Sequence, residues 1–271
     1  MPAISLEVEN LSAGYGPTRV LEGISFSVPA GARLAVLGRN GMGKTTLLAT
    51  LAGQTRRYEG SIRLGDSDVS AAPSATRAHK GLGYVPQARC IFPTLTVEEN
   101  LFVGLKARPK TALEEAYAMF PRLKERRRNL GSQLSGGEQQ MLSTARTILG
   151  RPSVLLLDEP LEGLAPVICE ELMAAFADLA KTGDMTIVLV EQRIQSALDF
   201  ADQVVILERG RLAWTGTPEN LTRDHEAVES LLGVGGLIDG MIGRSAGSAD
   251  CSPLAFKIAL GAPSNSCSIS S

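Results

Sequence analysis

A glycine-rich run of the sequence has the residue types and the spacing that bind a polyphosphate. Residues 38–45 read G-R-N-G-M-G-K-T, which matches the pattern G-x-x-x-x-G-K-[ST], between an apolar stretch at 34–37 and a helix expected to begin near Lys44. Glycines let the backbone wrap closely around phosphates with its N–H groups turned inward, and the helix start adds the positive end of its dipole. We expect Lys44 to bridge the β- and γ-phosphates of a nucleotide and the Thr45 hydroxyl to bind Mg²⁺. The nucleotide contacts expected from this run are Gly38, Asn40, Gly41, Gly43, Lys44, Thr45 and Thr46.

Two neighbouring carboxylates follow a second apolar stretch. Residues 154–157 are all Val or Leu and lead directly into Asp158 and Glu159. Ligands gather at the carboxyl ends of strands in a parallel sheet, so this strand would bring both acids to the edge that carries the phosphate loop. Asp158 suits Mg²⁺, directly or through water, and Glu159 suits polarisation of an attacking water. A strand that merely ends in two solvated acids is the alternative, but the phosphate loop upstream favours nucleotide hydrolysis.

A third run offers a further place for an anion. Residues 134–138 read L-S-G-G-E and precede a helical stretch at 139–149. Ser135 is a natural helix cap, and Gly136 and Gly137 leave N–H groups exposed where the helix starts. The run therefore predicts a second anion site, with a simple capped helix as the alternative.

The elements that must position these residues follow an alternating pattern. From residue 33 onward, short runs of Val, Ile and Leu alternate with helical stretches, which predicts an α/β fold with a mainly parallel central sheet. Buried strands are expected at 34–37, 154–157, 186–190 and 204–207, and half-exposed antiparallel strands at 6–8, 20–28 and 61–64. Between Gln87 and Gln133 the period becomes helical, with helices expected at 97–105 and 112–120. The pattern predicts a β-rich flank, a parallel core and a helical insert.

Composition and charge narrow the function classes. The chain has 271 residues, of which 44% are hydrophobic and 21% charged, so disorder throughout is excluded. Its 27 Lys and Arg residues against 29 Asp and Glu residues give a net charge of -2, and this balance predicts no nucleic-acid partner. No apolar run is long enough to span a membrane, and the first ten residues lack the layout of a secretory signal, so a cytosolic location is expected.

Three further features carry weaker predictions. The basic residues at 123–128 are expected on a solvated helix face rather than in a nucleic-acid patch, because acids lie nearby and no aromatic residues interleave. Residues 236–271 are rich in Gly, Ser and Ala and are expected to form a mobile tail without a catalytic role. The four cysteines form no C-x-x-C pair, which argues against a zinc site or a disulfide framework.

Taken together, the three runs resemble the ATP-binding cassette (ABC) family, whose signature is L-S-G-G-Q or L-S-G-G-E. The resemblance covers about residues 4–233, and the motifs occur in the order and spacing of the family. It implies a P-loop NTPase core with a mainly parallel sheet, an N-terminal antiparallel β subdomain and a helical subdomain inserted at about 88–150, all within a nucleotide-binding domain at 1–235. It also implies ATP and Mg²⁺ as cofactors, with Ser135, Gly136, Gly137 and Glu138 among the ATP contacts.

The resemblance assigns roles to two residues that would be weak candidates alone. Tyr15 takes the position of the aromatic residue that stacks on adenine, although it could also be a simple turn residue. Gln87 takes the position of the glutamine that senses Mg²⁺ and the attacking water, although it could be an ordinary loop residue. The implied Mg²⁺ ligands are Thr45, Gln87 and Asp158. In the family, the segment here at 88–130 touches the membrane-spanning partner.

Two departures from the common family pattern point to a subgroup. Gln192 stands where many members have a histidine, and a neutral amide can donate a hydrogen bond to the γ-phosphate but cannot bring a positive charge. Ala165 stands where many members have an aspartate that contacts the opposite subunit. Both departures, in E-G-L-A-P and V-E-Q, resemble the ATPases of branched-chain (hydrophobic) amino acid importers, and urea and short-chain amide importers have closely similar ATPases.

The arrangement of the motifs predicts a two-subunit machine. Lys44 and Glu159 would hold a nucleotide from one side, whereas Ser135 and Gly137 belong to a different helix start, so the same γ-phosphate needs a second ABC ATPase subunit. The resemblance further implies two membrane-spanning permease subunits, a periplasmic solute-binding protein and a peripheral location on the cytoplasmic side of the inner membrane. The alternatives are a soluble ABC ATPase outside transport and a small-molecule kinase, and the kinase would leave the L-S-G-G-E run without a purpose.

Overall fold

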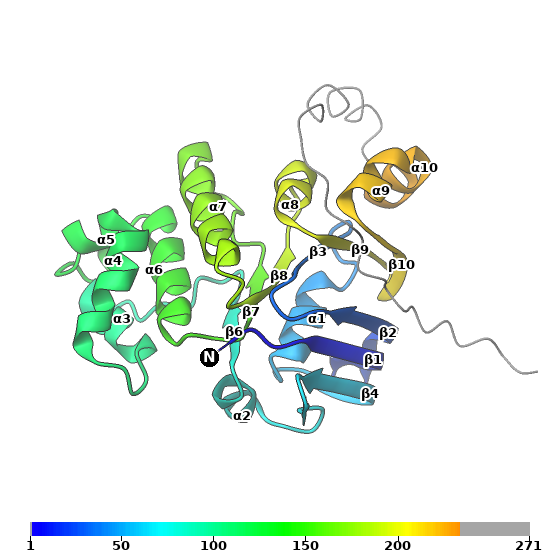
Figure 1. The fold of residues 1–271 in the computed structure, drawn as a ribbon, viewed down its shortest axis with the longest axis horizontal. Coiled ribbons are helices and arrows are strands. Elements are labelled where there is room, and N and C mark those ends of the chain that lie inside the picture. The colour runs from blue at the N-terminus through cyan, green and yellow to red at the C-terminus, as the bar shows by residue number, and fades with distance from the viewer. Residues whose placement is uncertain (1, 234–271) are drawn as a thin grey trace, which may run out of the picture. The chain divides into compact units, whose positions relative to one another are not determined.

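The computed structural model describes residues 2–233, and a six-stranded sheet runs through its centre (Figure 1). The strand order is β10-β9-β3-β8-β7-β6, with every pair from β9 to β6 parallel and β10 antiparallel to β9. The strands are β3 (Arg33–Leu37), β6 (Leu82–Val85), β7 (Val154–Asp158), β8 (Thr186–Val190), β9 (Gln203–Glu208) and β10 (Arg211–Gly216). The predicted α/β class with a mainly parallel sheet is confirmed. Strands β6 and β10 were not among the predicted ones.

A second sheet is wholly antiparallel and has the order β2-β1-β4-β5. Its strands are β1 (Leu6–Tyr15), β2 (Thr18–Val28), β4 (Arg56–Leu64) and β5 (Ser67–Asp68). The antiparallel arrangement agrees with the prediction, but β1 is much longer than the predicted 6–8. Its pairing with β2 shifts register between Val8 and Leu11 and again beyond Leu11, so the alternation of apolar and polar residues breaks within the strand.

Helices connect the strands, and several of them lie between β6 and β7 in the sequence. The helices are α1 (Lys44–Leu51), α2 (Ser74–His79), α3 (Val97–Gly104), α4 (Leu113–Met119), α5 (Pro121–Glu125), α6 (Gly136–Leu149), α7 (Pro166–Lys181), α8 (Ile194–Phe200), α9 (Pro218–Arg223) and α10 (His225–Ala227). Helices α3 to α6 gather at the left of Figure 1, away from β1, β2 and β4. Within residues 2–233, no helix combines the length and the apolar character that crossing a membrane requires.

The sequence fixes where the two helices of the insert that carry capping boxes begin. The Thr96 hydroxyl caps α3 by accepting a hydrogen bond from the Glu99 N–H, and the Glu99 carboxylate accepts one from the Thr96 N–H. Ser135 and Glu138 form the same reciprocal pair at the start of α6. The predicted helices 97–105 and 112–120 correspond to α3 and α4, and α6 starts at Gly136 rather than at the predicted 139.

Strand β7 shows why its end is a suitable place for polar groups. Val154 and Leu156 pack into the cluster that contains the antiparallel sheet and α1, whereas Leu155 and Leu157 pack into the cluster that contains α3 to α7. The strand is thus apolar and buried on both faces, as parallel strands covered on both sides are. Polar side chains are tolerated at the carboxyl end of the strand, and Asp158 and Glu159 lie there.

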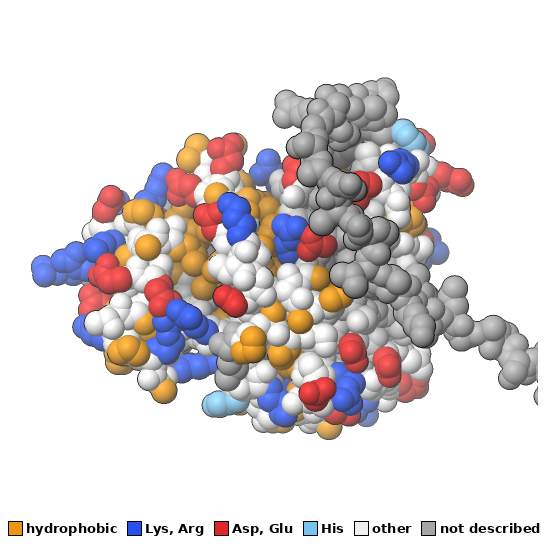
Figure 2. All heavy atoms as spheres, viewed as in Figure 1, with side chains coloured by type: hydrophobic (Ala, Val, Ile, Leu, Met, Phe, Trp, Pro, Cys, Tyr) orange, Lys and Arg blue, Asp and Glu red, His pale blue; other side chains and the backbone are white. Residues whose placement is uncertain are grey.

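The basic run at 123–128 is partly on a helix and partly in a turn. Helix α5 ends at Glu125, so the prediction of a solvated helix face was wrong in helicity for the three arginines that follow, which are exposed in a turn. Lys124 pairs with Glu114 at 2.8 Å, and Arg126 lies 3.5 Å from Glu138. Blue and red side chains are accordingly interspersed over this part of the molecule in Figure 2.

The predicted domain limits lie partly outside the residues that the structure describes. The described residues all fall in the unit Met1–Gly236. The extent of the helical subdomain at about 88–150 stays a prediction, and the predicted tail at 236–271 lies outside the described residues.

Candidate functional site

The glycine-rich loop joins the end of β3 to the start of α1, as its sequence predicts. Gly38 has a φ of 144°, and a Cβ atom built on it would lie 2.4 Å from the carbonyl oxygen of Leu207. That oxygen belongs to strand β9, which pairs with β3, so the contact cannot be relieved by moving a flexible side chain. Only glycine fits at this position, and its presence lets the loop turn tightly out of the sheet.

The start of α1 presents N–H groups that no protein side chain satisfies. Its N-cap is Gly43, which has no side chain to accept a hydrogen bond from the helix. Leu47 is the first residue whose N–H is accepted within the helix, by the Gly43 carbonyl at 2.8 Å. In the part of the chain that the structure describes, the N–H groups of Lys44, Thr45 and Thr46 have no acceptor. Together with the helix dipole, these donors make a cradle that fits a phosphate group.

The Lys44 side chain contacts both the glycine-rich loop and one of the two acids. Its Nζ atom lies 2.8 Å from the Gly38 carbonyl oxygen, 3.1 Å from that of Arg39 and 3.5 Å from Oε1 of Glu159. Both side chains of the ion pair are buried, with exposed fractions of 4% for Lys44 and 7% for Glu159. The Lys44 ammonium thus neutralises the Glu159 carboxylate beside the phosphate cradle.

Asp158 is held by two hydroxyl groups. The Thr45 hydroxyl lies 3.2 Å from its Oδ1 atom, and the Tyr84 hydroxyl donates to its Oδ2 atom at 3.1 Å. Burial raises the pKa of Asp158, although both hydrogen bonds and the Lys44 charge oppose the shift. Burial and the nearby Asp158 charge likewise raise the pKa of Tyr84, so its hydroxyl stays a donor. Carboxylate and hydroxyl oxygens that converge beside a phosphate cradle are ligands that fit Mg²⁺.

Glu159 occupies an unusual backbone conformation that is stabilised from several sides. Its φ is 46°, in the left-handed region that glutamate rarely adopts. Its N–H donates to the Val190 carbonyl at 2.9 Å, which anchors the residue to the end of β8. Its Oε2 atom accepts hydrogen bonds from Nε2 of Gln192 at 2.7 Å and from Nε2 of Gln87 at 3.4 Å. The structure therefore brings Lys44, Gln87 and Gln192 together around this carboxylate.

Two further acids lie close to this group, and sequence reasoning did not select them. Glu162 accepts a hydrogen bond from Nε2 of Gln87. Glu191 is buried with an exposed fraction of 3% and accepts the backbone N–H groups of Leu161 and Gln192. Burial raises the pKa of Glu191, and its backbone hydrogen bonds partly offset that rise.

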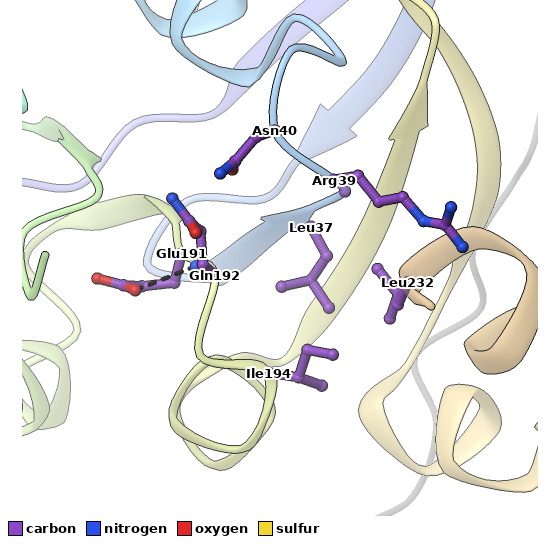
Figure 3. A pocket seen from close by; sticks show the side chains of 8 residues that line it. Leu37, Arg39, Asn40, Glu191, Gln192, Ile194 and Leu232 are labelled. Atoms are coloured by element: carbon purple, nitrogen blue, oxygen red, sulfur yellow. Dashed lines mark hydrogen bonds between the residues drawn. The ribbon is translucent and has the colours of Figure 1, made fainter. Parts of the chain in front are cut away.

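A pocket of about 260 Å³ opens beside the glycine-rich loop. It is lined by Leu37, Gly38, Arg39, Asn40, Glu191, Gln192, Ile194 and Leu232. In Figure 3 the amide groups of Asn40 and Gln192 lie on one side of it, whereas the Arg39 side chain extends toward Leu232. The Arg39 guanidinium donates to the Ser230 carbonyl at 3.1 Å. Asn40 thus reaches the pocket from the same loop that forms the phosphate cradle.

The predicted second anion site is not brought to the first one. Figure 1 shows α6 apart from α1, with β6 and β7 between them. The Glu138 carboxylate accepts the Ser135 N–H at 2.8 Å, and the Glu138 N–H donates to the Ser135 hydroxyl at 3.3 Å. Partial burial alone would raise the pKa of Glu138, but the hydrogen bonds from Ser135 and the charge of Arg126 lower it. Glu138 therefore caps the helix as an anion, and its role as an ATP contact stays a prediction.

The two glycines of this run and the predicted adenine platform Tyr15 differ in their exposure, and their roles stay predictions. A Cβ atom on Gly136 would lie 2.7 Å from the Arg89 guanidinium, so this helix start is closely covered. Gly137 is partly exposed at the first turn of α6. Tyr15 is the last residue of β1 and is 51% exposed.

None of the three missed residues carries a sequence signal of its own. Tyr84 lies on β6, which pairs with β7 in parallel, but this strand has only four residues and was not predicted. Glu191 has no signal because an acid before Gln192 has no pattern that separates a buried carboxylate from a solvated one. Glu162 lies within the turn at residues 160–163, whose conformation the sequence does not specify.

Comparisons with known proteins agree with this geometry. The ABC transporter family model matches residues 21–162. A high-affinity branched-chain amino acid transport ATP-binding protein of Pseudomonas aeruginosa, BraG, is 38% identical to this chain and covers 84% of it and 99% of its own length. The lipopolysaccharide export system ATP-binding protein LptB of Haemophilus influenzae is 33% identical, over 84% of this chain and 97% of its own length.

A solved structure of an ATP binding subunit of an ABC transporter has the same fold. It superposes with a TM-score of 0.73 at 26% identity and covers 84% of this chain and 96% of that chain. The family model spans more than half of the chain, and the relatives are matched over nearly their whole length. The chain therefore belongs to the ABC transporter family and is an ATP-hydrolysing subunit of a transporter.

Proposed function

We propose that this subunit energises the import of branched-chain or other hydrophobic amino acids. The observation that carries the proposal is the 38% identity to BraG over almost the whole of that protein. The E-G-L-A-P run that ends at Pro166 and the V-E-Q run that ends at Gln192 support the same subgroup. The second candidate is export of lipopolysaccharide, which the 33% identity to LptB favours. A urea or short-chain amide importer is the third.

Reconstitution separates these candidates. The tagged chain would be purified in detergent from its native cells with the membrane proteins bound to it, and the complex would be placed in proteoliposomes with its solute-binding protein. We expect leucine or valine to stimulate ATP hydrolysis. Stimulation by lipopolysaccharide and not by amino acids would favour the exporter, and stimulation by urea or acetamide alone would favour the amide importer.

We propose the following roles for the residues around the cradle. Lys44 binds the β- and γ-phosphates, and Glu159 accepts a proton from the attacking water while Gln87 orients it. Thr45 and Asp158, with Gln87, would hold Mg²⁺, which neutralises developing charge on the phosphate oxygens when it is bound. The remaining phosphate contacts come from the loop, namely Gly38, Asn40, Gly41, Gly43 and Thr46, and Tyr15 stacks on adenine.

The separation of the two anion sites supports a two-subunit arrangement. Ser135, Gly136 and Gly137 would contact a nucleotide held in the cradle of a second ABC ATPase subunit, because α6 and α1 of one chain lie apart. ATP then favours the closed pair, since its γ-phosphate touches both subunits only in that state. Two permease subunits would receive the movement through the segment at 88–130, and a periplasmic solute-binding protein would deliver the solute. The subunit would lie on the cytoplasmic side of the inner membrane.

Tyr84→Phe is expected to weaken the apparent affinity of the ATPase for Mg²⁺. The variant loses the hydroxyl that donates to Asp158, and residues that orient a metal ligand typically affect metal affinity by about 10–100-fold. We expect the Mg²⁺ concentration for half-maximal hydrolysis to rise by about tenfold at saturating ATP. Tyr117→Phe is the matched control, because the Tyr117 hydroxyl has no hydrogen-bond partner within residues 2–233. An unchanged Mg²⁺ dependence in Tyr84→Phe would exclude the positioning role.

Gln192→His is expected to raise the intrinsic ATPase rate. The Gln192 amide donates to Glu159 at 2.7 Å, and an imidazolium there would add a positive charge beside the γ-phosphate, for a gain of a few fold, about 1 kcal/mol. The neighbouring carboxylate would favour the charged imidazole, so the gain should be largest at low pH and disappear as the pH rises through the pKa of the new histidine. Steady-state rates between pH 6 and pH 9, roughly the window in which histidine titrates, test this. A rate equal to or below the parental one at every pH would contradict the electrostatic argument.

A further inference from the structure

Glu191 is a buried carboxylate to which the proposed reaction assigns no role. It follows the last residue of β8 and is 3% exposed. Its Oε1 atom accepts the Leu161 N–H at 3.0 Å, and its Oε2 atom accepts the Gln192 N–H at 3.1 Å. Within residues 2–233, no Lys, Arg or His lies within ion-pair distance of it. Its negative charge is therefore stabilised by backbone N–H groups rather than by a cation.

The two N–H groups belong to segments that carry other residues of the site. Leu161 lies two residues after Glu159, immediately before the E-G-L-A-P run, and Gln192 donates a hydrogen bond from its side-chain amide to Glu159 at 2.7 Å. The contacts form a closed ring that passes from Glu159 along the chain to Leu161, through the Glu191 carboxylate to Gln192, and back to Glu159. The dashed line in Figure 3 marks the link from Gln192 to Glu191.

A carboxylate is the side chain that can close this ring. Both of its oxygens accept, so it binds two converging N–H groups at once, whereas an amide offers one acceptor and turns a donor toward the second N–H. Burial of an unpaired carboxylate is unfavourable, and burial raises the pKa of Glu191 accordingly. An apolar residue would avoid this cost but would leave two buried N–H groups without an acceptor.

We propose that Glu191 is a positioning residue that sets the Gln192 amide on the Glu159 carboxylate and anchors the loop that begins at Leu161. The inference rests on the proposed role of Glu159 as the base. Glu191 itself touches no reacting atom. It acts by fixing the backbone of Gln192 on one side and that of Leu161 on the other, so that Glu159 keeps its left-handed conformation and its orientation.

The first test separates turnover from binding. We expect Glu191→Gln to lower kcat by at least about tenfold, because one of the two N–H bonds is replaced by a donor–donor contact, and to change the affinity for a fluorescent ATP analogue by less than about threefold. In hydrogen exchange without nucleotide, the peptide that contains Leu161 should exchange faster. Glu219→Gln, an exposed residue on α9, makes the same charge change away from the site and should match the parent. Parental kcat or unchanged exchange in Glu191→Gln would overturn the proposal.

A double-variant cycle tests whether Glu191 acts through Gln192. In a Gln192→Ala background, Glu191→Gln should lower the single-turnover rate by a smaller factor than in the parental background, since the Gln192 contact is already gone and only the anchoring of Leu161 is lost. Two effects that simply multiply would overturn the proposal. If Glu191→Gln does not fold, Glu191→Asp replaces it in the same cycle, because the shorter side chain keeps both oxygens but cannot span both segments. Parental hydrolysis by Glu159→Gln would instead overturn the proposed base, whatever the cycle shows.

Discussion

A Glu159→Gln variant is expected to bind ATP as tightly as the parent and to hydrolyse it at least about 100-fold more slowly, because general-base catalysis contributes about 10²–10⁴-fold. The substitution preserves the shape of the side chain and removes its ability to accept a proton. Glu159 does not belong to the phosphate cradle, which is built from the loop and the start of α1. ATP affinity should therefore change little.

The contacts of Glu159 explain why the amide should be tolerated. The amide oxygen can still accept the bond that Gln192 donates, and Lys44 keeps its bonds to the carbonyl groups of Gly38 and Arg39. ATP that is bound but not cleaved keeps the γ-phosphate that favours the closed pair of subunits. We therefore expect the variant to accumulate as a dimer with ATP and Mg²⁺, together with its proper companion ATPase if the pair is not made of two copies of this chain.

The measurement combines three assays on the same preparation: equilibrium ATP binding, phosphate release and size-exclusion chromatography with light scattering. Glu170→Gln, an exposed residue on α7, is the matched control for the change of charge. Glu162→Gln tests the neighbouring acid that also contacts Gln87. Hydrolysis at the parental rate in Glu159→Gln would exclude it as the base, and loss of hydrolysis in Glu162→Gln alone would transfer the role to Glu162.

The parts of this site that could be predicted are those whose position follows from a local sequence pattern. Strand β8 has the predicted bounds Thr186–Val190, and β3 and β7 differ from the predicted strands by one residue, because each is a short run of apolar residues buried on both faces. The adjacency of the phosphate loop and the two acids then follows from the parallel arrangement. The contacts from Lys44 to Glu159 and from Thr45 to Asp158 are its direct consequence.

Residues whose role depends on tertiary contacts were beyond the sequence patterns. Strand β6 contains only four residues, two of them glycine and tyrosine, so its apolar signal is too short to identify it or to place Tyr84 beside Asp158. The burial of Glu191 depends on the path of the loop at Leu161, which the sequence does not encode locally. The left-handed backbone of Glu159 is likewise set by its contact with Val190 rather than by its residue type.

Lys44→Ala is expected to weaken ATP binding by about 10–100-fold, since hydrogen bonds to charged groups contribute about 1.5–3 kcal/mol each. The Lys44 ammonium is buried beside Glu159 and close to Asp158. Without the Lys44 ammonium, the phosphates would enter a site that holds two carboxylates. No other side chain at the start of α1 supplies a positive charge there. The loss should appear in equilibrium binding of ATP and be smaller for adenosine, which lacks the phosphates. Equal ATP affinity in parent and variant would refute the role of Lys44.

The ion pair between Lys44 and Glu159 makes a sharper version of this experiment possible. If part of the lost affinity arises because the Glu159 charge is no longer neutralised, adding Glu159→Gln to Lys44→Ala should recover some ATP affinity, about tenfold for an interaction of about 1.4 kcal/mol. In the parental background, the same Glu159→Gln change should leave ATP affinity unchanged. Lys44→Met, which keeps the apolar stem in the buried space, controls for lost packing. Equal effects of Glu159→Gln on ATP affinity in both backgrounds would show that the two side chains act on the nucleotide independently, and the idea that Lys44 supports ATP binding by neutralising the Glu159 charge would then have to be abandoned.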